Sequence, residues 1–151
     1  MTNITIKTAL KTFNVHNILA NSLIDEIPNH NGLITCPPYG NLEKYEGEGN
    51  ISKFKKYDEF LINYKKILVR TTAKALPNST YCIMVGDWRS KGVYYNFSLD
   101  TENIMNKLGF KTADKIIVNQ KKTANWRVMM INSKKFKYTA KVHQYLLIFK
   151  N

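Results

Sequence analysis

The alternation of short apolar runs with amphipathic helical segments constrains the fold of this chain most. Runs typical of buried strands occupy residues 14–19, 32–36, 81–86, 115–118 and 142–149, the first being the weakest. Helices are predicted for residues 57–76, ended by Pro77, and for residues 97–108, capped by Gly109. This alternation predicts an α/β fold in which about five strands form a sheet with flanking helices.

Length and composition narrow the class of protein. With 151 residues, 44% of them apolar, the chain is long enough for one domain, residues 1–151, and too short for two ordinary ones. Its 23 basic and 11 acidic side chains give a formal charge of +12, which favours a nucleic acid as partner and an anionic membrane only second. No apolar run is long enough to span a membrane and no signal-peptide pattern is present, so we expect a cytoplasmic chain.

Cysteines and histidines predict no metal site. Cys36 and Cys82 are too few for a disulfide framework or a four-thiolate zinc site, and both lie in apolar runs where we expect burial. His16 and His30 have no metal-ligand spacing with each other or with the cysteines. His143, at the start of the last apolar run, is expected to be packed and hydrogen-bonded.

The end of the second apolar run carries the most informative motif, Cys36-Pro37-Pro38-Tyr39. Two prolines cannot continue the hydrogen-bonding pattern of a sheet, so they hold backbone carbonyls at the strand exit, where open sheets bind ligands. Such carbonyls can accept hydrogen bonds from an exocyclic amino group while Tyr39 stacks on the ring that bears it. The alternative is a plain Pro-Pro turn with Tyr39 packed on the core.

Cys-Pro-Pro-Tyr after an apolar strand resembles the Asp/Asn/Ser-Pro-Pro-Tyr/Phe motif of amino-group DNA methyltransferases that use S-adenosylmethionine. The stretch of residues 33–45 resembles the phage-type DNA methylase family in particular, and similar segments follow in the same order at 57–61, 84–89 (Met-Val-Gly-Asp-Trp-Arg), 95–97, 114–118 and 143–149. The resemblance implies a Rossmann-like methyltransferase fold. It also implies methylation of adenine N6 or cytosine N4 in a flipped base, with Cys36, Pro37, Pro38 and Tyr39 as the catalytic residues.

Two residues depart from that pattern. Cys36 stands where the family has Asp, Asn or Ser, and a thiol orients an amino group less well, so the Pro37 carbonyl would do more of this task. Asn21 replaces the acid that lies near the adenine of the cofactor, and its side-chain carbonyl can still accept a hydrogen bond. The resemblance places Asn21 and Cys36 on the cofactor side of the site.

The Gly-rich turn that holds the methionine end of the cofactor in the family is missing from the sequence. Gly47-Glu48-Gly49 follows no strand and is typical of a flexible loop. We therefore expect an incomplete methyltransferase fold whose Pro-Pro-Tyr strand has an unpaired edge and an exposed apolar face. A second protein chain carrying the Gly-rich half, self-association, or a sheet rearranged within the chain could cover them.

The last third of the chain is basic, with no acidic residue after Asp114. Its segment 120–141 interleaves cations with aromatic rings, which suits phosphate contacts beside stacking platforms; a solvated lysine-rich loop is the alternative. The predicted nucleic-acid-binding residues are Lys121, Lys122, Trp126, Arg127, Lys134, Lys135 and Lys137.

Asp87 and Arg89 follow the third apolar run and lie near the predicted cleft, where an Asp-Arg pair could serve the site or brace the loop. The sequence thus predicts a DNA methyltransferase, or a subunit of a split one, in a bacterial or phage-infected cytoplasm. The alternative is a catalytically inactive relative that serves as a DNA-binding, regulatory or assembly subunit.

Overall fold

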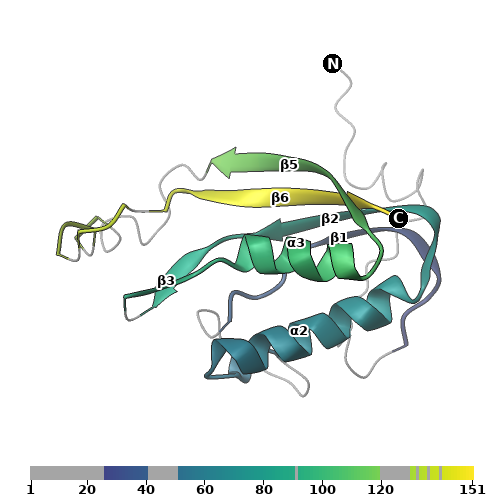
Figure 1. Cartoon of the computed structure of the whole chain (residues 1–151), viewed down its shortest axis with the longest axis horizontal. Coiled ribbons are helices and arrows are strands. Elements are labelled where there is room, and N and C mark those ends of the chain that lie inside the picture. The colour runs from purple at the N-terminus through teal and green to yellow at the C-terminus, as the bar shows by residue number, and fades with distance from the viewer. Residues whose placement is uncertain are drawn as a thin grey trace, which may run out of the picture.

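The computed structural model describes residues 26–40, 51–90, 92–119, 130–131, 133–135, 137–139 and 141–151. It forms two layers, a sheet and a pair of helices (Figure 1). The sheet contains β1 (His30–Thr35), β2 (Ala75–Val85), β5 (Lys111–Asn119) and β6 (His143–Lys150) in the order β1-β2-β6-β5. Strand β1 runs parallel to β2, and β6 runs antiparallel to both of its neighbours. The predicted α/β fold is confirmed.

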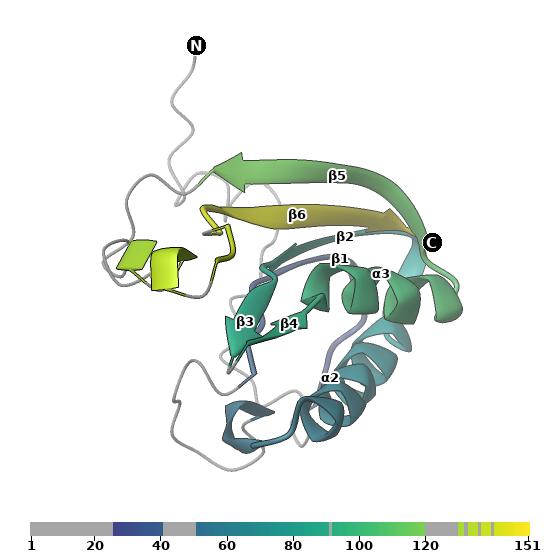
Figure 2. The same cartoon turned by 60° about the vertical axis from the view of Figure 1, so that its left-hand side comes forward.

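Two helices, α2 (Tyr57–Thr72) and α3 (Phe97–Lys107), lie on the same side of the sheet (Figures 1 and 2). A 3-10 turn, η1 (Ile51–Lys53), precedes α2, and a short hairpin of β3 (Trp88–Ser90) and β4 (Val93–Tyr95) joins β2 to α3. Helix α3 ends as predicted, with Leu108 as its cap and Gly109 at a φ of 91°. No helix in the described ranges is both long enough and apolar enough to cross a bilayer.

Aromatic side chains fill the core between the two layers. Phe60 and Tyr64 of α2 stack on each other with ring centroids 5.9 Å apart, and both rings contact Phe97 of α3. Tyr81 and Phe149, neighbours on β2 and β6, are fully buried beneath the helices. Rings of this size bury a large apolar area, and this burial fixes the helices against one face of the sheet.

The boundary between α2 and β2 differs from the prediction. The helix ends at Thr72 and not at Leu76, because Ala75 pairs with His30 of β1. The hydroxyls of Thr71 and Thr72 donate hydrogen bonds to backbone carbonyls in the last turn of the helix. Pro77 lies inside β2, in an irregular stretch where the pairing with β1 jumps from Ala75 to Thr80. A proline that donates no hydrogen bond is tolerated at such an irregularity.

Four of the five predicted strands are present, and the fifth, residues 14–19, lies outside the described residues. The hairpin of β3 and β4 was not predicted, since three-residue strands give no detectable period. The expected burial of both cysteines is wrong: Cys36 is exposed and Cys82 half-buried. Cys36 is exposed because it follows the last residue of β1, where the chain leaves the sheet.

The sheet face turned away from the helices is apolar. Alternation along the strands places Ile34 of β1, Cys82 and Met84 of β2, and Leu146 and Ile148 of β6 on this face, which we call the open face. Ile34 is 86% exposed. Neither described helix covers the open face, and within the described ranges β1 pairs on one side only (Figure 2).

Candidate functional site

The turn after β1 lies at the carboxyl end of a sheet edge strand, beside the carboxyl end of the parallel strand β2. Pro37 is buried, Pro38 and Tyr39 are half-buried, and Cys36 faces solvent. Gly40 closes the turn with a φ of 55°, and a Cβ at this position would lie 3.0 Å from Cζ2 of Trp88. The turn is therefore packed tightly against the base of the β3–β4 hairpin.

Tyr39 connects this turn to the rest of the sheet. Its hydroxyl accepts a hydrogen bond from Nε2 of Gln144 on β6 at 2.6 Å, and lies 3.6 Å from Sγ of Cys36. Its ring centroid is 6.2 Å from that of Trp88 and 6.4 Å from that of Phe97. These contacts hold the half-buried ring at the strand exit.

Asp87, two residues after the end of β2, organises the neighbouring hairpin. Its carboxylate accepts hydrogen bonds from the Tyr94 hydroxyl at 2.6 Å and from the backbone N–H of Ser98 at 2.9 Å. Nζ of Lys141 lies 3.8 Å from the same carboxylate. Burial and the hydrogen bond to Asp87 raise the pKa of Tyr94, because its ionised form would bring a second negative charge beside this carboxylate.

Asp87 and Arg89 do not form the ion pair that the sequence suggested. The guanidinium of Arg89 lies over the rings of Tyr94 and Tyr138, with Cζ 4.8 Å and 4.9 Å from the two centroids. Tyr138 belongs to the predicted basic segment, so this stacking joins that segment to the hairpin. Asp87 thus stabilises the β3–β4 hairpin, whereas the Arg89 guanidinium contacts the rings of Tyr94 and Tyr138.

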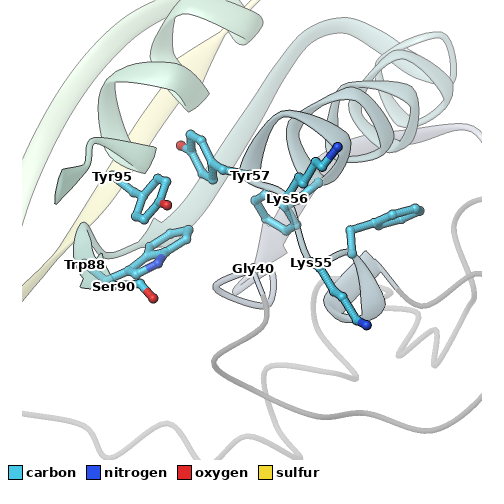
Figure 3. Close-up of a pocket in the computed structure, with 9 residues that line it drawn as sticks. Gly40, Lys55, Lys56, Tyr57, Trp88, Ser90 and Tyr95 are labelled. Carbon is cyan, nitrogen blue, oxygen red and sulfur yellow. The ribbon is translucent and has the colours of Figure 1, made fainter. Parts of the chain in front are cut away.

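A small recess of about 40 Å³, open to solvent, lies beside Gly40 (Figure 3). It is lined by Gly40, Phe54, Lys55, Lys56, Tyr57, Phe60, Trp88, Ser90 and Tyr95. Tyr57 is fixed by a hydrogen bond of 2.5 Å from its hydroxyl to Asp100 on α3, and burial together with this carboxylate raises its pKa. The recess lies between the amino end of α2 and the β3–β4 hairpin.

The structure brings together only part of the predicted site. Cys36, Pro37, Pro38 and Tyr39 form one turn, and Lys134, Lys135 and Lys137 are exposed in the segment that carries Tyr138. Asn21, Lys121, Lys122, Trp126 and Arg127 lie outside the described residues. No three His, Cys, Asp or Glu side chains gather as a metal site within the described ranges. His143 is half-buried and its Nε2 lies 3.1 Å from the Tyr145 hydroxyl, as predicted for a packed histidine.

Two contacts of the site were missed in the sequence. Gln144 meets Tyr39 across 105 positions of the chain, so no local spacing could indicate this hydrogen bond. The contact of Arg89 with two tyrosines depends on a hairpin that was not predicted. One indication of this contact is present in the sequence, the interleaving of cations and aromatic rings in residues 120–141.

Solved structures of similar fold are DNA methylases. A protein of Thermus thermophilus assigned as a DNA modification methylase aligns with a TM-score of 0.61 and 16% identity over 87% of this chain and 49% of its own. Its complex with S-adenosyl-L-methionine aligns with a TM-score of 0.57 and 18% identity, over 87% and 52%. The cytosine-N4-specific PvuII DNA methyltransferase gives a TM-score of 0.59 and 14% identity, over 85% and 45%.

No protein-family model and no curated protein matches the chain. The chain spans about half the length of the solved structures that it resembles. At these identities the likeness concerns the fold alone, a mixed α/β fold that matches about half of each of these solved structures.

Proposed function

We propose that this chain is the base-binding part of a DNA methyltransferase that acts on adenine N6 or cytosine N4 of an extruded base. The observation that carries the proposal is the position of the Pro37-Pro38-Tyr39 turn. It lies at the carboxyl end of a parallel edge strand in a methyltransferase fold, with the Tyr39 ring half-exposed and anchored to β6. Ligands of open α/β sheets bind at such strand ends.

We assign the residues of the Pro37-Pro38-Tyr39 turn the role of positioning the base. The extruded base stacks on Tyr39, and its amino group donates hydrogen bonds to carbonyls of the Pro-Pro turn, chiefly that of Pro37. This orients the nitrogen lone pair towards the methyl donor. S-adenosylmethionine, when bound, would supply an activated methyl group. The nitrogen would form its bond to the methyl carbon as the carbon–sulfur bond breaks, S-adenosylhomocysteine would leave with the electron pair of that bond, and the nitrogen would release a proton to water. Alignment of the reacting atoms provides most of the rate in such a transfer.

The described residues do not by themselves form a cradle for S-adenosylmethionine. Their glycines at positive φ, Gly40, Gly92 and Gly109, lie in separate turns and form no Gly-rich loop after a strand. Within the described residues, the open face is an apolar surface and β1 has an unpaired edge of backbone hydrogen-bonding groups, and both are features that a second segment covers. We therefore infer that a second protein chain supplies the cofactor-binding half, and that this chain or self-association covers the open face.

The test is methyl transfer by the native particle. The tagged chain is purified under native conditions, its mass is measured, and it is incubated with S-adenosylmethionine carrying a labelled methyl group and unmethylated DNA. We expect N6-methyladenine or N4-methylcytosine from a particle heavier than the chain, and neither product nor cofactor binding from the isolated chain. Tyr39→Ala should lower the rate about 5- to 150-fold, the equivalent of one base-stacking contact of about 1–3 kcal/mol.

Lys107→Gln, at the exposed carboxyl end of α3, is the matched control and should leave the rate unchanged. Tight binding of S-adenosylmethionine by the isolated chain would contradict the split site. A native particle that binds DNA but forms no methylated base would contradict the transfer itself.

That last outcome would favour a second function, a DNA-binding or regulatory subunit that has kept the fold. Cys36 is the observation that supports it, because an exposed thiol stands where the methyltransferase motif has a stronger hydrogen-bonding group. Cys36→Asp separates the two functions. It should raise the rate of methyl transfer in an active particle and leave an inactive one unchanged.

A further inference from the structure

The guanidinium of Arg89 lies over two aromatic rings. Arg89 pairs directly with Tyr94 across the hairpin of β3 and β4, and its Cζ lies 4.8 Å from that ring centroid. Tyr138, from the segment between β5 and β6, lies at 4.9 Å. Rings that contact the face of a guanidinium leave the N–H groups along its edge available, and these are the groups that bind an oxyanion.

The neighbouring carboxylate does not neutralise Arg89. Asp87 already accepts hydrogen bonds from Tyr94 and from the backbone of Ser98, and Lys141 lies 3.8 Å from it. Lys141 also donates to the Tyr94 hydroxyl at 2.8 Å. The ion pairs found within the described ranges do not include Arg89. The charge of Asp87 is thus balanced by Lys141, and that of Arg89 remains.

The surroundings of Arg89 are basic and adjoin the proposed base site. Lys134, Lys135 and Lys137 are exposed in the same segment as Tyr138. Trp88, next to Arg89 in the chain, contacts Tyr39, whereas strand alternation turns Arg89 to the other face of the hairpin. The hairpin thus contacts Tyr39 through Trp88 and presents Arg89 on its other face.

We propose that Arg89, held against Tyr94 and Tyr138, binds a backbone phosphate of the DNA. This inference rests on the proposed function for the identity of the anion. A planar guanidinium binds two phosphate oxygens at once, which a lysine cannot do. Because both tyrosines hold the side chain before DNA arrives, little rotamer freedom is lost on binding.

The test measures the affinity of the chain for a fluorescent DNA duplex at several salt concentrations. Each phosphate contact contributes a slope of about −0.9 to the plot of log K against log salt concentration. Arg89→Gln should reduce the magnitude of this slope by about one contact. Arg89→Lys should retain the slope but bind more weakly, because the charge stays while the bidentate geometry is lost.

Tyr138→Leu should also leave the slope unchanged and weaken binding about two- to fivefold, since the cation is kept but is no longer held in place. Lys107→Gln on the distant end of α3 is the control and should alter neither quantity. The far-ultraviolet circular dichroism of each variant confirms that it is folded. An unchanged slope for folded Arg89→Gln overturns the inference.

The outcomes also separate this inference from the function on which it rests. A native particle that transfers no methyl group, combined with the expected loss of slope in Arg89→Gln, would overturn the methyltransferase proposal alone. Methyl transfer by a particle whose salt dependence ignores Arg89 would overturn the phosphate site alone. Binding of wild-type chain that does not depend on salt would overturn both.

Discussion

At the scale of single residues, Gly40 decides how closely the Pro-Pro-Tyr turn can approach the hairpin. Its backbone is in the left-handed region with a φ of 55°, and the indole of Trp88 occupies the space that a side chain would need. Trp88 in turn contacts Tyr39, so a shift at Gly40 is passed on to the ring that the base would stack on. One missing side chain therefore controls the geometry of the site.

Gly40→Ala should lower the free energy of unfolding by about 1–3 kcal/mol, through left-handed strain and the clash with Trp88. Gly92→Ala is the matched control, because Gly92 also has a positive φ, 82°, but no atom of the described residues lies within 4 Å of the added methyl group. Urea denaturation of both variants measures the difference. Equal losses would show that Trp88 yields to the new methyl group at no cost.

The residues of the site differ in how far the sequence could predict them. The turn at Pro37, Pro38 and Tyr39 could be predicted from the local sequence, because two prolines after an apolar run end a strand wherever they occur. The contacts of Gln144 and Tyr138 form only when β6 and the basic segment are folded beside the turn and the hairpin, so the local sequence does not predict them. Side chains brought together by tertiary contacts leave no spacing in the sequence.

At the scale of elements, long periodic segments were predictable and short ones were not. Helix α3 has the expected start and end, because its apolar stripe, its acidic first turn and Gly109 agree with one another. Helix α2 ends four residues early, since the start of β2 was assigned to the helix. The apolar pattern of residues 75–76 suits either element, and pairing of Ala75 with His30 of β1 decided between them.

Strand β1 is the element on which assembly should depend. Ile34→Lys should change the free energy of unfolding by no more than about 0.5 kcal/mol, because the side chain is 86% exposed. It should nevertheless dissociate the native particle, since a charge would be buried in the interface. Native mass spectrometry checks the second expectation and urea denaturation the first.

Ile62→Lys is the control for this prediction, because Ile62 of α2 is 56% exposed and lies on the helix layer, away from the open face. It should leave the mass of the particle unchanged. A particle that survives Ile34→Lys intact would show that the open face is covered in some other way.

At the scale of the whole molecule, buried tyrosines set the limit of stability at alkaline pH. Burial raises the pKa of Tyr81 to about 12, and burial also raises the pKa of Tyr64. Above pH 10 the unfolded chain releases the tyrosine proton while the folded chain keeps it, so the unfolded state binds fewer protons. The free energy of unfolding should therefore be insensitive to these groups below pH 10 and fall as the pH rises towards 12.

Tyr81→Phe should make this fall shallower by up to about 1.4 kcal/mol per pH unit, the contribution of one proton. Below pH 10 the variant should be less stable than the wild-type chain by about 1–3 kcal/mol, because His30 Nε2 and the Thr71 carbonyl lose their bonds to the hydroxyl. Urea denaturation between pH 8 and pH 11.5 provides both values. Parallel pH curves for the two proteins would contradict the role of Tyr81.

The exposed thiol of Cys36, directly after β1, is a natural attachment site for a reporter group. Cys82 is half-buried in the sheet, whereas Cys36 is exposed and its Sγ lies 3.6 Å from the hydroxyl of Tyr39. A maleimide dye or a spin label would therefore attach first beside the ring proposed to receive the base. Protection from alkylation, or quenching of the dye, would reveal occupation of the cleft in real time without any engineered substitution.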